Sequence, residues 1–216
     1  MSSHPKSSAR REARAKAEAD PVVLRRHVLD GLEGAPGAAF EPEGANAFQM
    51  RRPPPTCRHV LRIPAAAAGA QGALRGFDIG QPINAARGHE TLMSPDPRAS
   101  LRLGPDEWLL IGPLGAEDGP TAGMLVDVSH RNVAIDVRGT HVRDVLNTGL
   151  ALDLEDAAFP IGTASRTLFA KAEIVLVRCD DQDGLATFRI ECWRSFARYL
   201  VGHLKQSAAL LGFSDA

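Results

Sequence analysis

The segments IVLV (residues 174–177), DDQDG (180–184) and FRIEC (188–192) follow one another and decide the fold. IVLV is apolar at every position, which is typical of a strand in the centre of a sheet, and we expect this strand to span residues 167–179. DDQDG is a polar run that ends in glycine and predicts a turn. In FRIEC apolar and charged residues alternate, which predicts a second strand. The stretch therefore predicts an antiparallel hairpin.

The sequence on either side of this hairpin predicts a further strand and two helices. Residues 133–137 alternate between apolar and other side chains and indicate a half-buried strand. Thr140 is a favourable N-cap for a helix over residues 142–146, and Gly149 is a favourable residue to end it. Ser195 is expected to cap a final helix, whose apolar stripe consists of Phe196, Tyr199, Leu200 and Leu204.

The first half of the chain predicts a similar succession of elements. In order, we expect a strand (58–63), a weak helix (65–74), a loop (76–97), a hairpin of two strands (99–103 and 107–111) and a short strand (125–128). Strand, helix and hairpin thus recur in both halves. The sequence predicts an α+β protein with two ferredoxin-like β-α-β-β-α-β halves.

Residues 1–56 are predicted to form an extended, partly disordered N-terminal arm, and residues 57–216 to form the α+β domain. Residues 1–26 have an excess of basic side chains and no apolar face, and no uninterrupted apolar run of a secretory signal occurs there. Residues 21–55 are rich in proline and glycine, which favours an extended chain that cannot build a core alone. Its functional interpretation is an arm that becomes ordered on a partner subunit.

The composition argues against several classes of protein. The 216 residues include 25 Lys and Arg against 26 Asp and Glu, so the net charge of −1 provides no general attraction for nucleic acid or an anionic membrane. No run of 18 apolar residues occurs, and a membrane span is not expected. The three cysteines, Cys57, Cys179 and Cys192, contain no C-x-x-C pair and favour buried thiols in a cytoplasmic protein.

Motifs that would carry catalysis are missing or incomplete. The sequence has no G-x-G-x-x-G after a strand and no P-loop, and His89-Glu90 lacks the second histidine of a zincin because Met93 stands in its place. Asp127-Val128-Ser129-His130 gathers polar groups at a strand end. Adjacent serine and histidine side chains point apart on a strand, so we interpret this cluster as a turn held by local hydrogen bonds. We therefore assign no catalytic, cofactor-binding or metal-binding residue.

Several segments resemble known families. LVDVSH (125–130), the strand at 133–137 with Gly139, and the helix at 142–146 resemble the folate-dependent aminomethyltransferase (glycine-cleavage T-protein) family. Other segments are more specifically similar to the gamma subunit family of heterotetrameric sarcosine oxidase: LGPDEWLL (103–110), FPIG (159–162) with RTL (166–168), and RSFARYL (194–200). The resemblance covers roughly residues 57–212.

The resemblance implies a role within a larger enzyme. In that family the heterotetramer oxidatively demethylates sarcosine to glycine and releases hydrogen peroxide. The FAD, FMN, NAD, zinc and tetrahydrofolate are expected in the alpha, beta and delta partner subunits and not in this chain. A gamma subunit would contact mainly the alpha subunit and would itself be non-catalytic.

One segment departs from the active aminomethyltransferases. Those enzymes carry a Gly-Gly-Ile-x-Asp-Asp segment whose carboxylate contacts folate, whereas residues 169–174 here read FAKAEI. Glu173 is the nearest carboxylate, and we do not assign it as a folate ligand. The alternative hypothesis is a stand-alone folate-binding protein of the aminomethyltransferase-like class, which would need a pocket with a carboxylate for the pterin.

Overall fold

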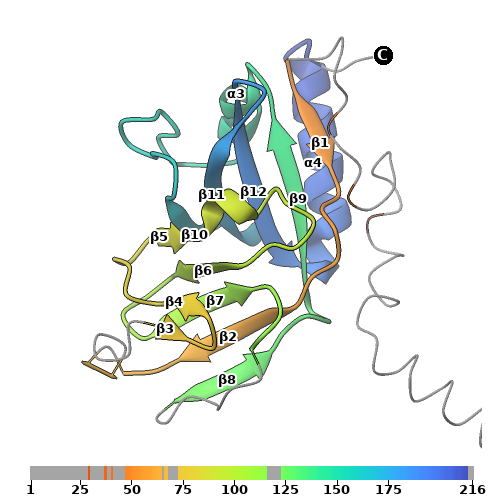
Figure 1. Cartoon of the computed structure of the whole chain (residues 1–216). Helices are drawn as coiled ribbons and strands as arrows, with labels where there is room; N and C mark the ends of the chain where they lie inside the picture. Colours follow the sequence, from red (N-terminus) through yellow and green to blue (C-terminus); the bar gives the residue numbers. More distant parts are fainter. Residues whose placement is uncertain are drawn as a thin grey trace, which may run out of the picture.

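Two five-stranded antiparallel sheets face each other (Figure 1). The structure, a computed structural model, describes residues 29, 37, 40, 47–64, 66–67, 73–115 and 123–213. The first sheet has the order β1 (Gln49–Arg51), β9 (Asn132–Arg138), β12 (Leu185–Trp193), β11 (Ala172–Gln182) and β10 (Ala164–Phe169). The second has the order β5 (Ala85–Arg87), β6 (Ala99–Arg102), β7 (Glu107–Ile111), β2 (Arg58–Arg62) and β8 (Met124–Asp127).

Helices cover the outer face of the first sheet. Helix α3 (Val142–Asn147), the 3-10 turn η3 (Arg194–Phe196) and α4 (Ala197–Leu210) pack there, with α4 running along β9 and β1 in Figure 1. The core on this side contains the apolar residues of β9, β11 and β12, for example Ile135, Leu176 and Ile190. The alternation of each strand thus places one set of side chains under the helices.

Apolar side chains also fill the space between the sheets and the outer face of the second sheet. Leu101, Leu109 and Val177 belong to the layer between the sheets, where the 3-10 turn η2 (His89–Thr91) closes one end. A small hairpin, β3 (Ala73–Leu74) and β4 (Phe77–Asp78), covers the outer face over Trp108. The fold therefore has helices, two sheets and a hairpin as successive layers.

The α+β class is confirmed, but the ferredoxin-like halves are not. The strand predicted over 167–179 is two strands, because the chain turns between Phe169 and Ala172 with Ala170 at a φ of 50°. A three-stranded antiparallel meander, β10 to β12, therefore follows α3. In the first half, the loop predicted over 76–97 contains β4, β5 and η2. The helix predicted over 65–74 falls partly outside the described residues and ends in β3.

Other predictions hold with small shifts. The hairpins at 99–111 and 174–192 are confirmed, and the second turns at Asp183-Gly184, where both residues have positive φ as a type I′ turn requires. The strand at 133–137 was expected to be half-buried, yet every residue of β9 is buried. On its other face Arg51 and Arg189 cover Asp136, and residues 52–55 lie beside Ala134.

The helix caps differ from the predictions. Helix α3 has His141, and not Thr140, as its N-cap residue, and it ends at Asn147 with Thr148 as its C-cap. The last helix is preceded by a 3-10 turn that contains Ser195, so Ser195 does not cap it. Helix α3 buries the predicted Val142, Val145 and Leu146. In α4, Leu200 and Leu204 are buried as predicted, whereas Tyr199 is exposed and Val201 is buried instead.

Part of the segment 1–56 lies in the described residues and packs on the domain. Strand β1 pairs with β9, and Leu29 and Phe40 are buried. The Phe40 ring lies 4.6 Å from the guanidinium carbon of Arg51 and 4.5 Å from that of Arg138. The remaining positions of the predicted arm lie outside the described residues.

Candidate functional site

A cleft of about 350 Å³ opens between the two sheets. Strands β2, β7 and β8 form one wall, and the facing wall comes from β10, β11 and β12. Most of its lining is apolar, including Val60, Leu109, Val126, Val128, Val175 and Trp193. Its volume lies at the lower end of the range for small-molecule sites, about 300–1,000 Å³.

Glu107 joins the two walls of the cleft. Its carboxylate accepts a hydrogen bond from Arg62 of the neighbouring strand β2, with Nη2 to Oε2 at 2.8 Å, and another from Arg166 of β10 in the other sheet. The hydrogen bond from Arg166 lowers the pKa of Glu107, and burial acts in the opposite direction. The same pairing raises the pKa of Arg166. Glu107 is therefore an ionised clasp between the sheets.

Replacing Glu107 by glutamine should lower the free energy of unfolding near neutral pH by about 1 kcal/mol, because both arginines are partly exposed. A lowered carboxyl pKa stabilises the folded state above the unfolded-state value of about 4.3, and this contribution is lost as the pH falls through the folded-state pKa. The difference between E107Q and wild type in urea unfolding should therefore shrink as the pH drops below about 4. The exposed Glu155→Gln is the matched control. A difference that does not change with pH would contradict the clasp.

Two buried ion pairs lie deeper between the sheets. Arg58 of β2 binds Glu191 of β12 with two bonds, Nε to Oε2 at 2.5 Å and Nη2 to Oε1 at 3.0 Å. Asp136 of β9 accepts two bonds from Arg189, at 2.7 and 3.1 Å, and one from Arg51 at 3.0 Å. Buried charges must be paired to be tolerated, and these pairs fix the strands that carry them. On the inner face of the first sheet, the side chains of β9 and β12 are therefore largely polar or charged, whereas those of β11 are mostly apolar.

Exposed apolar residues gather on the rim of the cleft. Met124 and Val126 of β8 are 62% and 43% exposed, and Trp193 at the end of β12 is 41% exposed. The Trp193 ring stacks on Phe196, and the guanidinium carbon of Arg131 lies 5.0 Å from its centroid. Tryptophan and arginine in such surroundings are frequent anchors of protein interfaces.

The Asp127–His130 cluster forms a turn held by local hydrogen bonds, as predicted. The backbone N–H of Ser129 donates to Asp127 Oδ1 at 2.7 Å, while Ser129 Oγ accepts from the backbone N–H of Arg58 at 2.7 Å. Burial tends to raise the pKa of Asp127, but the hydrogen bonds from Ser129 and nearby histidines outweigh it and lower that pKa. The cluster thus ties β8 to β2, and its serine hydroxyl is occupied by the backbone.

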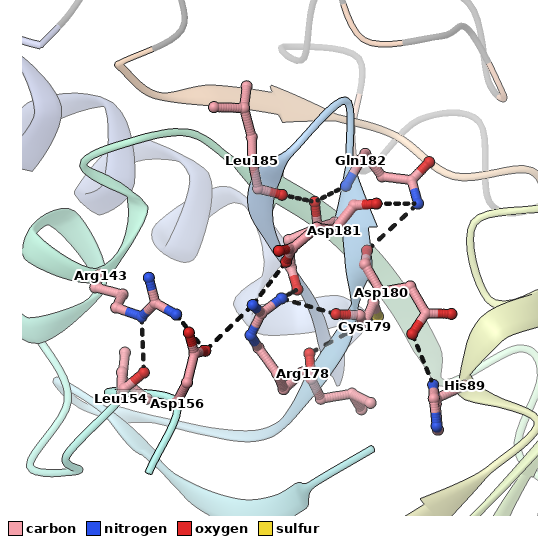
Figure 2. Close-up of polar contacts among 12 residues, drawn as sticks. His89, Arg143, Leu154, Asp156, Arg178, Cys179, Asp180, Asp181, Gln182 and Leu185 are labelled. Atoms are coloured by element: carbon pink, nitrogen blue, oxygen red, sulfur yellow. Dashed lines mark hydrogen bonds and ion pairs between the residues drawn. The ribbon is translucent and has the colours of Figure 1, made fainter. Parts of the chain in front are cut away.

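A second polar cluster lies at the other end of β11 (Figure 2). The buried Arg178 donates to the carbonyl oxygen of Cys179 at 2.8 Å and pairs with Asp181 at 2.6 Å and with Asp156 at 3.3 Å. Arg143 of α3 also pairs with Asp156, at 2.5 Å. Figure 2 shows these contacts joining the loop at Asp156 to the hairpin of β11 and β12, so the cluster is a structural tie.

Two cysteines and three histidines lie where their neighbours indicate a structural role. Burial raises the pKa of Cys179 and of Cys192 to about 12, so both thiols stay protonated near neutral pH. His59 lies in β2, where burial lowers its pKa, and His203 lies edge-on to Phe169 at 5.1 Å. His89 Nδ1 lies 3.5 Å from Asp180.

In the part of the chain that the structure describes, no three His, Cys, Asp or Glu side chains come together as metal ligands would. Among the helices of the described ranges, none combines the length and the apolar character needed to cross a membrane.

The charged residues of the cleft could not be identified from the sequence. Arg62, Glu107 and Arg166 stand at ordinary positions in strands or motifs, but the structure brings them together from three strands. The sequence does indicate a charged strand face, because Arg189 and Glu191 alternate with apolar residues in FRIEC. That pattern shows which residues share a face, but it does not show that a second sheet covers this face.

The fold defines a class of α+β protein in which two antiparallel sheets are joined by the ion pairs Arg58–Glu191 and Arg166–Glu107 and flanked by helices on one side. The chain belongs to the sarcosine oxidase, gamma subunit family, whose model matches residues 89–210, more than half of the chain. The resemblance found in the sequence is therefore confirmed.

Individual proteins agree with this assignment. The chain is 27% identical over 153 residues to a sarcosine oxidase subunit gamma of Arthrobacter sp., covering 67% of this chain and 71% of that protein. It is 28% identical over 119 residues to the subunit gamma of Corynebacterium sp. (strain P-1), covering 51% of this chain and 59% of that relative, less than two thirds of its length. A chain in the solved heterotetrameric sarcosine oxidase from Corynebacterium sp. U-96, in complex with pyrrole 2-carboxylate, has a similar structure. It matches with a TM-score of 0.66 and 25% identity, over 89% of this chain and 96% of that one.

Proposed function

We propose that this chain is the gamma subunit of a heterotetrameric sarcosine oxidase, which oxidatively demethylates sarcosine to glycine with release of hydrogen peroxide. The observation that carries the proposal is the structural similarity to a chain of such a complex over 96% of that chain's length. The family match over residues 89–210 supports it independently.

Within this complex the chain acts as a scaffold and not as the catalytic centre. Its partners are the alpha, beta and delta subunits, with direct contact mainly to alpha. These partners carry the FAD, FMN, NAD, zinc and tetrahydrofolate of the holoenzyme, and the complex works in the cytoplasm. In support of a scaffold role, the cleft carboxylates Glu107 and Glu191 are already engaged by arginines of this chain.

The test is co-expression of the tagged full chain with the alpha, beta and delta subunits of the same source. We expect the tag to retain all three, with a visible flavin spectrum and sarcosine-dependent peroxide formation. Omitting the gamma chain is the control and should reduce the yield of assembled complex. A tagged chain that retains no partner would contradict the proposal.

The same system tests whether residues 1–56 contribute to the interface. Leu29 and Phe40 are buried in the domain, so a truncation should end before them. Removal of residues 1–28 should leave a folded chain with weaker assembly. Unchanged assembly would show that residues 1–28 do not contribute to the interface with the partner subunits.

A stand-alone folate-binding protein is the second candidate function, and the cleft is the observation that favours it. The cleft is mostly apolar, and the exposed carboxylate of Glu173 lies on its lining, as a pterin site would require. Titration of the isolated chain with tetrahydrofolate tests it. Saturable micromolar binding that Glu173→Gln abolishes would favour this function over the scaffold role.

A further inference from the structure

Three of the four outer strands of the two sheets have neighbours among the described residues. Beside β1, the backbone N–H of Gly37 donates to Arg52 at 2.9 Å, and Phe40 packs on Arg51. Strands β5 and β10 are joined to each other, because Ala86 donates to Gly162 at 2.7 Å and Ala164 donates to Asn84 at 3.0 Å. Within the described ranges, β8 is the edge strand that has β2 on one side and no strand on the other.

The hydrogen-bond pattern shows which backbone groups β8 presents outward. The N–H of Val128 donates to Arg58 of β2, and the register continues with Val60 opposite Val126. Antiparallel pairs alternate between bonded and non-bonded residues. Met124 and Val126 therefore bond to β2, while the N–H and C=O groups of Leu125 and Asp127 point away from the sheet. A strand with such groups free is a template for another strand.

The side chains beside this edge define the chemistry of what could cover it. Met124 and Val126 point toward the cleft and are exposed, and Trp193 faces them across its mouth. Three exposed arginines, Arg62, Arg131 and Arg166, line the same cleft, with Glu173 as the exposed carboxylate. Arg62 and Arg166 pair with Glu107, so three arginines stand against two carboxylates, Glu107 and Glu173, and the rim keeps a net positive charge. Its apolar surface is continuous with the open edge.

We propose that an extended segment of a partner subunit adds to β8 as a further strand. Its alternate apolar side chains enter the cleft beside Val126 and Trp193, and a carboxylate of the segment meets the arginines of the rim. Strand addition uses main-chain bonds for affinity and side-chain pockets for specificity, and this surface supplies both. This inference rests on the proposed function, because it takes the occupant from another subunit of the oxidase.

Two other occupants fit the surface less well. A small molecule in the cleft would leave the outward groups of Leu125 and Asp127 without a strand partner. A second copy of this chain would bring the arginine-lined rim against an identical rim, and such like-charge contacts oppose association.

Hydrogen exchange of the assembled complex tests the strand addition directly. The complex from co-expression with alpha, beta and delta is compared with the isolated full chain, by fragmentation mass spectrometry at single-residue resolution. We expect exchange of the Leu125 and Asp127 amides to slow at least about tenfold on assembly, since they gain acceptors. The amides of Met124 and Val126 already bond to β2 and serve as internal controls. Unchanged exchange at Leu125 and Asp127 would overturn the proposal.

Variants separate this surface from the rest of the molecule. Val126→Lys places a charge in the cleft beside the arginines, and Trp193→Ala removes the rim anchor; each should reduce co-purification of the partners at least about tenfold. Leu210→Lys, at a 79% exposed position on α4, is the matched control and should co-purify like wild type. Circular dichroism and thermal unfolding report whether each variant is folded, and Met124→Lys replaces Val126→Lys if the latter does not fold.

The outcomes distinguish a failure of the proposed strand addition from a failure of the proposed function. If wild type assembles and the folded edge variants assemble equally well, the strand addition is wrong and the proposed function stands. If wild type retains no partner, both fail. If the isolated chain is a dimer that Val126→Lys dissociates, the occupant is a second copy and the proposal is overturned.

Discussion

Replacing Asp136 by asparagine should lower the free energy of unfolding by about 3–5 kcal/mol. The Asp136 carboxylate is fully buried and is bound by Arg189, which is also fully buried, and by Arg51. Asparagine keeps the shape but removes the negative charge, so it leaves buried guanidinium charge without compensation. The loss exceeds that of a surface pair because neither group can return to water in the folded state.

Urea unfolding at neutral pH measures this effect, with Asp144→Asn as the matched control. Asp144 also pairs with a basic group, His141, at 2.9 Å, but both side chains are exposed, so the control should lose no more than about 1 kcal/mol. In D136N R189Q the second change should recover part of the loss, because it removes the unpaired charge. A loss below about 1 kcal/mol for D136N would mean that water reaches the pair.

Asp136 also illustrates what the sequence could and could not predict. Alternation in residues 133–137 correctly assigned Val133, Ile135 and Val137 to one buried face. It gave no information on the opposite face, because the partners of Asp136 come from Arg51 and Arg189, 85 and 53 residues away. The local pattern therefore predicts the strand and its two faces, whereas the burial of the Asp136 face depends on side chains of β1 and β12 that are distant in the sequence.

The missed turn between β10 and β11 has a different cause. The hairpin between β11 and β12 carried an Asp183-Gly184 pair, which is the favoured sequence for its turn, and it was predicted correctly. The turn after Phe169 uses Ala170 at positive φ and contains neither glycine nor asparagine. Without a glycine or asparagine at this turn, residues 167–179 could only be interpreted as one strand. The three-stranded meander was therefore not predicted.

The cleft could not be predicted from the sequence because it requires both the facing sheet and the turn between β10 and β11. Arg166 lies on β10. Glu107 lies on β7, whose hairpin partner β6 was predicted, but neither its pairing with its other neighbour β2 nor the facing sheet was predicted. Trp193 directly follows the predicted strand FRIEC, and the structure leaves it 41% exposed on the rim of the cleft. The family assignment, in contrast, needed only short local segments and was available from the sequence.

Replacement by alanine should affect the stability of the chain at Trp108 and its assembly with partners at Trp193. Trp108 is completely buried under the β3–β4 hairpin, among Leu61, Phe77 and Leu110, and the guanidinium carbon of Arg102 lies 4.9 Å from its ring. Trp108→Ala should lower the free energy of unfolding by about 3–5 kcal/mol, since it leaves a cavity that the sheet cannot close. Urea unfolding of the isolated chain measures the loss directly.

Trp193→Ala is the comparison that makes this prediction specific. Trp193 is partly exposed and contacts Arg131 and Phe196 on the rim, so its loss should change stability by no more than about 1 kcal/mol. Its main effect should appear in assembly with the partner subunits. If the two variants were destabilised equally, Trp193 would be a core residue and the rim would lose its anchor. If only Trp108→Ala is destabilised while only Trp193→Ala fails to assemble, then the outer face of the second sheet maintains the fold, and the rim of the cleft makes the contact with the partner.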